Sequence, residues 1–296
     1  MPSASPHILL LAPGAKMALA RALARAAEAR GGRLTAREAD PVAPAAGCCH
    51  HTVSGAPIDD ADAAASLLDW CRREGVDLVV PSRHGDLPAL ASAREAFFSA
   101  GIALAISEPD CIRICLDKRN TWRWLSAHGL PVPAQTTVGE WPDSPLRDHL
   151  PLIAKSPTGS GSRQLVRVTE PAALAMLPAD WILQTPAPGR EYTVNVYVDR
   201  HGRSVCEIPH ARLMVGDGEV IRARTERIPV LMTLARRIAE GLPGARGPLN
   251  IQMFHDDRSG RTTVIEINPR FGGGYPLVDE AGGTFAEWLI SEYIEG

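Results

Sequence analysis

Short apolar runs alternate with alanine-rich, amphipathic stretches over the first hundred residues. Runs that are apolar throughout predict buried strands at 7–12 (HILLLA), 77–81 (DLVVP) and 102–106. Helices are predicted between them at 15–30, 59–74 and 87–100, and they are closed by Gly31, Gly75 and Gly101. Residues 40–57, rich in Pro, Ala, Gly and His, are predicted to form a loop. This alternation indicates a parallel sheet covered by helices.

The pattern changes in the second half of the chain. A helix with a cap-like Ser107 and an early proline is predicted to run to His128, before Gly129. From about residue 150, longer strands joined by tight turns are predicted at 151–155, 164–168, 181–184, 192–199, 204–208, 249–255 and 262–268. Only two helical stretches, 171–177 and 228–241, interrupt them. This half is therefore predicted to be α+β with antiparallel hairpins.

Composition narrows the class of protein. The chain of 296 residues suggests about two domains, and 31 Lys and Arg against 34 Asp and Glu give a net charge of −3. We therefore expect neither a nucleic-acid nor a membrane partner. No apolar run reaches the roughly 18 residues of a membrane span, and no basic residue precedes the short apolar stretch at the N-terminus. Six cysteines form no disulfide framework, so a reduced, cytoplasmic protein is expected.

The richest chemistry is predicted on a hairpin near the C-terminus. Strands at 248–255 and 262–268 are joined by the turn-forming segment DDRSGR. If the hairpin centres on Ser259, Gln252 lies opposite Glu266. The pairing therefore brings an amide and a carboxylate together.

The two-residue period of a strand then sets the faces. Val264, Glu266 and Asn268 are expected to face one way, and Ile265 and Ile267 the other. With the amide across the hairpin, three oxygen donors converge, and such hard ligands suit Mg²⁺, which Mn²⁺ can replace. A lone Glu-x-Asn is far more often an exposed polar strand face. The glycine-rich segment that follows Asn268 favours a magnesium site instead.

Two glycine-rich segments flank this chemistry. In Pro269–Gly274 (PRFGGG), three glycines allow the backbone to approach a ligand, and Arg270 offers a planar fork for a carboxylate or phosphate. The segment KSPTGSGSR, which begins at Lys155, can wrap phosphate oxygens with its backbone N–H groups. It is not a P-loop, because its lysine precedes the glycines. A floppy surface loop and a common Gly/Ser turn are the alternatives.

The order of these motifs resembles the ATP-grasp superfamily, in its carbamoyl-phosphate-synthase-like branch. The resemblance runs from about residue 75 to the C-terminus and is carried by LDK, GLPVP, IAKSPTGSGSRQLVRV, ILQTPAPGREYTVNVYVD, GPLNIQMF and VIEINPRFGGG. It implies an α/β N-terminal domain with a parallel sheet, followed by an α+β fold whose two subdomains clamp ATP. The implied boundaries are 1–109, 110–185 for the lid and 186–296 for the C-terminal subdomain.

The resemblance also implies residue roles. Lys118 and Lys155 would contact the ATP phosphates, and Glu191 would hold the ribose. The lid would contain Gly159, Ser160, Gly161 and Ser162, and the adenine-reading hinge Gln184, Thr185 and Ala187. The magnesium ligands would be Gln252, Glu266 and Asn268. Two hinge prolines, and Gln164 in the lid, depart from the family pattern.

The substrate side is implied less fully. Arg270, acting with Lys155, would meet the transferred phosphoryl group or the substrate carboxylate. Arg212, Arg224 and Gly273 are further candidates for binding the substrate acid, although a solvated basic face explains the two arginines equally well.

The implied activity is that of an ATP-dependent carboxylate–amine ligase, which forms an amide through an acyl phosphate. Its partners would be a small carboxylate and an amine, and a homodimer is compatible with it. Alternatives are a carbamoyl-phosphate-like or kinase-type enzyme and a nucleotide-binding regulator without turnover. The complete set of lysines, metal donors and Arg270 counts against the regulator.

Two further motifs stay open. Cys48-Cys49-His50-His51 contains zinc-binding residue types, but adjacent ligands cannot easily close one tetrahedral site, so a loop without metal is favoured. Arg83-His84-Gly85-Asp86 follows the strand at 77–81, at the end where open α/β sheets place ligands. A functional contact and a capping turn are both open interpretations there.

Overall fold

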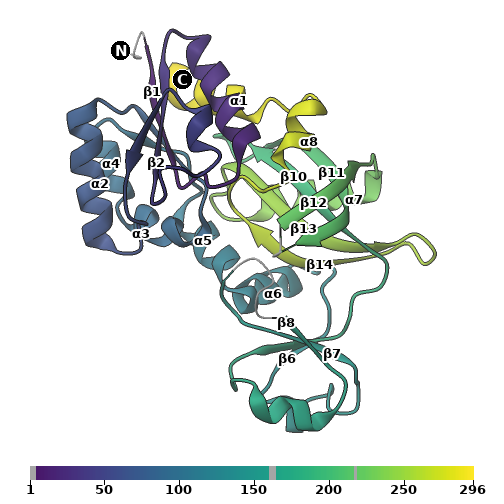
Figure 1. The fold of residues 1–296 in the computed structure, drawn as a ribbon. Coiled ribbons are helices and arrows are strands. Elements are labelled where there is room, and N and C mark those ends of the chain that lie inside the picture. The colour runs from purple at the N-terminus through teal and green to yellow at the C-terminus, as the bar shows by residue number, and fades with distance from the viewer. Residues whose placement is uncertain (1–4, 160–164, 217–218) are drawn as a thin grey trace.

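The N-terminal part is a parallel sheet with helices on its faces, as the pattern predicts (Figure 1). The computed structural model describes residues 5–159, 165–216 and 219–296. The strand order is β3-β2-β1-β4-β5. The strands are β1 (His7–Leu11), β2 (Arg33–Glu38), β3 (His51–Ser54), β4 (Leu78–Pro81) and β5 (Ala103–Leu104). The helices are α1 (Met17–Glu28), α2 (Ala61–Glu74), α3 (Leu87–Ser92) and α4 (Arg94–Ser99).

Two strands of this sheet differ from the expectation. β2 was not predicted, and β3 lies inside the segment 40–57 that was predicted to be a loop. β3 is the edge strand, and three of its four residues are exposed, so no apolar run marks it. The predicted helix 87–100 is also divided, at Ala93, into α3 and α4.

A second predicted helix is also divided, and this break sets the position of Lys118. The helix predicted up to His128 is two helices, α5 (Pro109–Leu116) and α6 (Lys118–Ala127). Asp117 between them has extended backbone angles, and its carboxylate accepts a hydrogen bond from the Arg119 N–H at 2.8 Å. Asp117 is therefore an N-cap, and Lys118 becomes the first residue of a new helix.

A small antiparallel sheet stands apart from the rest of the molecule (Figure 1). Its strand order is β6-β9-β7-β8, and we call it the lid sheet. The strands are β6 (Gln135–Thr137), β7 (Leu152–Lys155), β8 (Leu165–Val168) and β9 (Ile182–Gln184). Leu152, Ala154, Val168 and Leu183 form its own core with residues outside the strands. The helix predicted at 171–177 is a 3-10 helix over Pro171–Met176.

The helices α5 and α6 do not belong to the core of the lid sheet. Cys111, Ile114 and Leu125 from these helices lie in the core beneath the larger C-terminal sheet. We therefore propose that the lid begins after α6, rather than at residue 110.

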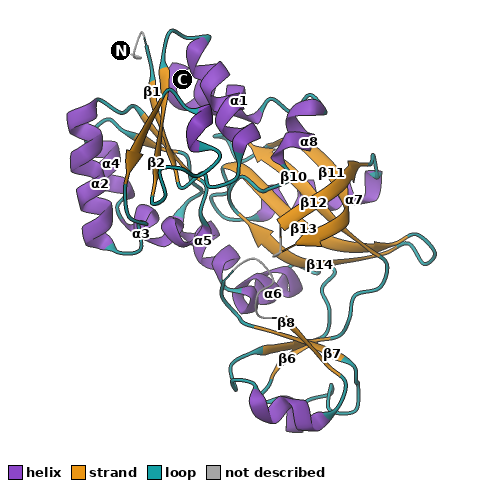
Figure 2. Ribbon diagram, viewed as in Figure 1, coloured by secondary structure: helices purple, strands orange, loops and turns teal. Residues whose placement is uncertain are grey.

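The larger sheet, whose strands are drawn in orange in Figure 2, has one apolar and one polar face. Its order is β12-β11-β10-β13-β14, antiparallel throughout. The strands are β10 (Arg190–Val198), β11 (Ser204–Gly216), β12 (Glu219–Thr225), β13 (Gly247–Asp256) and β14 (Arg261–Asn268). Val194 and Ile251 on one face pack against Leu231 and Ile238 of α7 (Pro229–Gly241). The other face carries the polar side chains.

Strands β13 and β14 pair in the predicted register at the residues expected to bind magnesium. Gln252 pairs with Glu266, and two residues along the strand Asn250 pairs with Asn268. Nearer the turn, the register shifts by one residue, because Met253 pairs with Val264 and leaves Ile265 as a β-bulge.

The bulge corrects the predicted alternation of faces. Val264 is buried with Ile267 in the apolar core, whereas Ile265 lines a cavity together with Glu266. The expectation that Val264 shares a face with Glu266 was wrong, because an inserted residue reverses the alternation on one side of it.

The C-terminal helices join the sheets. α8 (Tyr275–Glu280) and α9 (Phe285–Ile290) lie against α1 (Figure 1). Phe285 shares one buried core with Leu10 of the parallel sheet and Tyr197 of the large sheet. The N-terminal domain is thus fixed against the large sheet. No helix within the described ranges is long and apolar enough to cross a membrane.

Gly189, at the entry to β10, permits a close backbone crossing. Its φ is +92°, and a Cβ there would overlap the carbonyl of His255. Gly202 also has a positive φ, of +76°, but open space surrounds it. We predict that Gly202→Ala lowers the free energy of unfolding by about 1–2 kcal/mol, and that Gly189→Ala lowers it by about 1–3 kcal/mol more. Equal losses in urea unfolding would contradict the crossing.

Candidate active site

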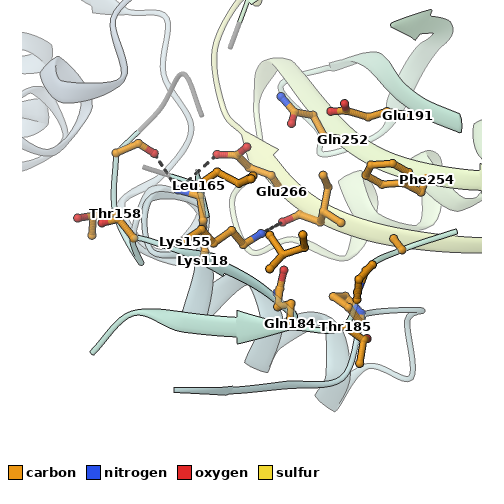
Figure 3. Close-up of a pocket in the computed structure, with 17 residues that line it drawn as sticks. Lys118, Lys155, Thr158, Leu165, Gln184, Thr185, Glu191, Gln252, Phe254 and Glu266 are labelled. Carbon is orange, nitrogen blue, oxygen red and sulfur yellow. Dashed lines mark hydrogen bonds and ion pairs between the residues drawn. The ribbon is translucent and has the colours of Figure 1, made fainter. Parts of the chain in front are cut away.

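A cavity of about 570 Å³ separates the lid sheet from the polar face of the large sheet (Figure 3). It is lined by α6, β7, the segment after β9, and strands β10, β13 and β14. The predicted site residues that line it are Lys118, Lys155, Gly159, Gln184, Thr185, Ala187, Glu191, Gln252 and Glu266. Ser160, Gly161 and Ser162 lie outside the described residues.

The cross-strand register explains the polar floor of this cavity. Residues paired across strands point to the same face, so His210, Thr193, Gln252 and Glu266 form one row. Asn195, Asn250 and Asn268 form the adjacent row, two residues along each strand. Glu266 and Asn268 are thus neighbours on one face of β14.

Lys155 reaches across from the lid sheet to the bulge. Its Nζ donates a hydrogen bond to the carbonyl oxygen of Ile265 at 3.4 Å (Figure 3). Burial lowers the pKa of Lys155 to about 8, and the charge of Lys118 acts in the same direction. The carboxylates of Glu266 and Glu191 oppose this shift. A buried ammonium of this kind is suited to a ligand that brings negative charge.

Lys118 links the lid to the large sheet. Its Nζ donates to the carbonyl of Gly159 at 2.8 Å and lies 3.7 Å from Oε1 of Glu266. Its backbone N–H also donates to the Pro157 carbonyl at 2.8 Å. The chain has only three lysines, and two of them, Lys118 and Lys155, line this cavity. The compact ammonium charges of the two lysines are therefore concentrated at this cavity.

Glu266 and the two amides form a donor set for a hard cation. Gln252 faces the same cavity as Glu266, and Asn268 does not line it. Oδ1 of Asn268 is buried, and the ring of His84 lies beside the Asn268 side chain. The part of the chain that the structure describes contains no group of three His, Cys, Asp or Glu that could hold a metal. Any ion here would therefore depend on one carboxylate and on amide oxygens.

The segment after β9 offers specific backbone groups. Gln184 lies within the lid sheet, between β6 and β7, and its side-chain amide donates to Oε1 of Gln135 at 2.6 Å. The Thr185 N–H donates to the Ala134 carbonyl at 3.1 Å, and Pro186 has no N–H. The Thr185 carbonyl and the Ala187 N–H are therefore the groups best placed to bind a ligand edge.

Glu191 and Arg212 form an ion pair at the other end of the polar floor. Nε of Arg212 lies 3.1 Å from Oε1 of Glu191, and the Arg212 side chain is only 6% exposed. Burial raises the pKa of Glu191, and Arg212 opposes that shift. Arg212 also donates to Oγ1 of Thr193 at 3.4 Å.

Three other predicted substrate residues are not among those that line this cavity. Arg224 pairs with Ala211, which faces the apolar core, so the register places Arg224 on the opposite face from the cavity. There it forms an ion pair with Glu226 at 2.6 Å, and we exclude it from the site. Gly273 is a half-buried turn residue between β14 and α8. Arg270, which follows β14, donates to the Phe271 carbonyl at 2.9 Å.

The glycine run has a structural reason. A Cβ on Gly272 would overlap the side chain of Asn250, and one on Gly274 would overlap the ring of His210. The run thus packs directly onto the polar floor, and two of its glycines are explained by protein contacts rather than by a ligand.

Sequence reasoning missed His210 and left His84 undecided. His210 is buried on β11, and its Nδ1 lies 3.0 Å from Nδ2 of Asn195. The alternation along β11 could have placed it on the polar face. Burial lowers the pKa of His84 to about 4, with further lowering by Arg270 and Lys118. His84 therefore lies near the cations of the site.

The Cys48-Cys49-His50-His51 segment is built into the N-terminal domain. The Cys49 thiol donates to the Ala45 carbonyl at 3.5 Å. Nδ1 of His50 accepts from the Leu34 N–H at 2.9 Å, and its Nε2 lies 2.8 Å from Glu28. These contacts account for His50 without a metal.

Two protein-family models match the chain. Residues 115–274 match the ATP-grasp domain, and residues 8–105 match the PylC-like N-terminal domain. None of the curated proteins compared with the chain matches it.

Solved structures match almost the whole length. Biotin carboxylase from Campylobacter jejuni, in a β-γ-ATP complex, has a TM-score of 0.78 and 16% identity, over 97% of this chain and 70% of that one. N5-carboxyaminoimidazole synthetase from Staphylococcus aureus with ADP has a TM-score of 0.74 and 13% identity, over 98% and 77%. The biotin carboxylase domain of 2-oxoglutarate carboxylase from Hydrogenobacter thermophilus, with MgADP and bicarbonate, gives 0.76 and 16%, over 97% and 69%. These likenesses show the fold.

The electrostatics of Lys155 can be tested directly. In protein labelled with ¹³C-lysine, three side-chain signals are expected, and the one that Lys155→Arg removes should titrate near pH 8. Because the Glu266 carboxylate stabilises the ammonium, Glu266→Gln should lower this pKa further. A Lys155 signal that titrates at the ordinary value near 10.4 would show that the amine is solvated.

Proposed function

This chain belongs to the ATP-grasp family, and from that premise we propose that it is an ATP-dependent carboxylate–amine ligase. The observation that carries the proposal is that two lysines, Gln252 of β13 and Glu266 of β14 face one cleft. A triphosphate needs cations on several oxygens at once, and this cleft offers them from two walls. We also propose that the protein is located in the cytoplasm.

The nucleotide would bind along the cleft. Its adenine edge would meet the Thr185 carbonyl and the Ala187 N–H, between apolar side chains such as Ile153 of the lid and Phe254 of the floor. Its ribose would lie at Glu191, and its phosphates would reach Lys118 and Lys155. The lid residues Gly159 to Ser162 would cover the phosphates, as the family resemblance implies.

The donor set fits a magnesium ion. Gln252, Glu266 and Asn268 would hold it, and the strand register that puts these three oxygen donors on one face is the feature of the structure that favours this. When bound, Mg²⁺ would neutralise charge on the phosphate oxygens. With one carboxylate in the set, substrate phosphates would supply further ligands.

The chemistry proposed for the cleft is phosphoryl transfer followed by amide formation. A carboxylate oxygen of the acid attacks the γ-phosphorus, the bond to the β-phosphate oxygen breaks, and ADP leaves with that electron pair. The amine nitrogen then attacks the acyl carbon of the acyl phosphate, phosphate departs with the C–O electron pair, and the amine proton passes to the departing phosphate. Lys118, Lys155 and Arg270 would hold the anions in place, and no side chain acts as a covalent nucleophile.

Product analysis separates this activity from the alternatives. We expect ADP and free phosphate in equal amounts when an acid and an amine, drawn from pairs of amino acids, are both present. A kinase would give a phosphorylated product without free phosphate, and a regulator would give neither. Phosphate release that needs only one of the two substrates would contradict the ligase.

Substitution of Glu266 tests most directly whether the donor set of the cleft is needed for turnover. We predict that Glu266→Gln lowers kcat by about hundredfold or more, because it removes the only charge of the donor set. Glu280→Gln, an exposed glutamate on α8, is the matched control and should retain activity. Turnover of Glu266→Gln at the control rate, in the presence of Mg²⁺, would overturn the assignment of the donor set.

A further inference from the structure

A second cavity, of about 490 Å³, lies beside β5, the edge strand of the parallel sheet. Its walls come from α4, from β5, from the turn between β10 and β11, from the segments that precede α5 and β13, and from the short helix Ser291–Glu295. The N-terminal domain and the large sheet therefore both contribute to it. None of the described residues that line it also lines the cleft under the lid sheet, so the two cavities are separate.

Three arginines line this cavity from three different segments. Arg94 begins α4, Arg200 lies in the turn after β10, and Arg246 precedes β13. Nη2 of Arg94 lies 3.0 Å from Oε1 of Glu108, and its Nη1 donates to the Ile106 carbonyl at 3.2 Å. The guanidinium of Arg94 is therefore largely bonded to neighbouring parts of the chain.

The other two arginines are less completely bonded. Nη2 of Arg246 lies 3.5 Å from the same oxygen of Glu108, so two guanidinium groups share one carboxylate. The backbone of Arg246 is fixed, because Oγ of Ser107 donates to its carbonyl and accepts from its N–H, both at 3.0 Å. Arg200 is exposed, and its guanidinium has no ion-pair partner among the described residues. Arg200 and Arg246 thus keep N–H donors for another molecule.

The remaining carboxylates at the cavity do not neutralise these two arginines. Glu292 accepts a hydrogen bond from the Tyr197 hydroxyl at 3.0 Å. Burial raises the pKa of Glu292, while the hydrogen bond from Tyr197 and the charge of Arg200 oppose that shift. Glu95 is exposed on α4, where solvent screens its charge. The charges at this cavity therefore favour an anion beside Arg200 and Arg246.

Apolar groups and one hydroxyl complete the walls. The ring of Phe98 is 78% exposed, and it lines the cavity together with Ile102 and Leu104. Tyr293 also lines the cavity, and its buried hydroxyl has no hydrogen-bond partner within the described part of the chain. Buried hydroxyls are nearly always paired, which favours a partner that is not part of the chain. Apolar walls with a few polar groups are typical of small-molecule sites.

We propose that this cavity is a second binding site, for a small organic anion that joins a carboxylate or phosphate group to an apolar body. A guanidinium binds either oxyanion through paired N–H donors, so the charged group would meet Arg200 and Arg246. The apolar body would lie against Phe98. Because both domains form the walls, an occupant would hold the N-terminal domain against the large sheet. This inference goes beyond the proposed ligase function and does not depend on it.

The test uses 4-fluorophenyl phosphate as the probe and follows its binding by ¹⁹F NMR. We expect a Kd of about 1 mM or lower, as is usual for a ligand of this size, and the same Kd with and without saturating MgADP. 4-Fluorophenylacetate, which carries a carboxylate beside a similar ring, is the second arm and distinguishes the two head groups. 4-Fluorobenzyl alcohol has no charge and should bind about tenfold more weakly or not at all.

Three variants locate the probe. Arg200→Gln and Arg246→Gln should each raise the Kd about fivefold or more, because each removes a guanidinium. Phe98→Ala removes the exposed ring and should raise it about threefold. Arg258→Gln is the matched control and should bind as the wild type, because Arg258 is an exposed arginine in another turn, between β13 and β14. Thermal unfolding followed by circular dichroism reports whether each variant is folded.

Each outcome decides for or against the site. Binding of only one of the two anions would support it and identify the head group. The proposal would be overturned if neither anion bound, if the alcohol bound as tightly as the anions, or if MgADP displaced the probe. An unchanged Kd in Arg200→Gln would also overturn it, and this exposed turn residue decides even if Arg246→Gln does not fold.

Discussion

The cross-strand register of β13 against β14 is the constraint on which the rest of the site depends. Pairing Gln252 with Glu266 puts an amide and a carboxylate on the same face, and the next pair adds Asn250 and Asn268. The opposite face is apolar and packs on α7, so burial of that face holds the polar one in place. A slip of one residue would exchange the two faces and bury Glu266 in a hydrocarbon core, at a cost that excludes that register.

The bulge at Ile265 is a second feature that sets which groups face the cleft. It turns Val264 back into the core and leaves the Ile265 carbonyl to accept a hydrogen bond from Lys155. Lys118 makes a similar link, from the Gly159 carbonyl to the carboxylate of Glu266. The lid and the floor therefore meet through two ammonium groups, and the partly buried charge is arranged before a polyanion arrives. Such preorganisation is how a site stabilises phosphate charge without reorganising during the reaction.

Local sequence patterns predicted much of the fold and of the cleft, but not all of either. The parallel sheet and the pairing of Gln252 with Glu266 follow from apolar runs and from the turn around Ser259, which are short-range signals. The break at Asp117 could not be read in this way, because a helix pattern continues through it. The position of Arg224 depends on its pairing with Ala211, and that of His84 on how two domains dock. Both are long-range outcomes that the period of one strand does not contain.

The central claim is that Glu266 and its neighbours hold a divalent cation against a nucleotide in this cleft. Crystals grown with ADP and Mn²⁺, and measured at the manganese edge, would test it most directly. The account predicts an anomalous peak within about 2.2 Å of a Glu266 carboxylate oxygen, with the ADP phosphates on its other side and the adenine at Ala187. A nucleotide bound elsewhere, or a manganese ion that contacts no residue of β13 or β14, would contradict it.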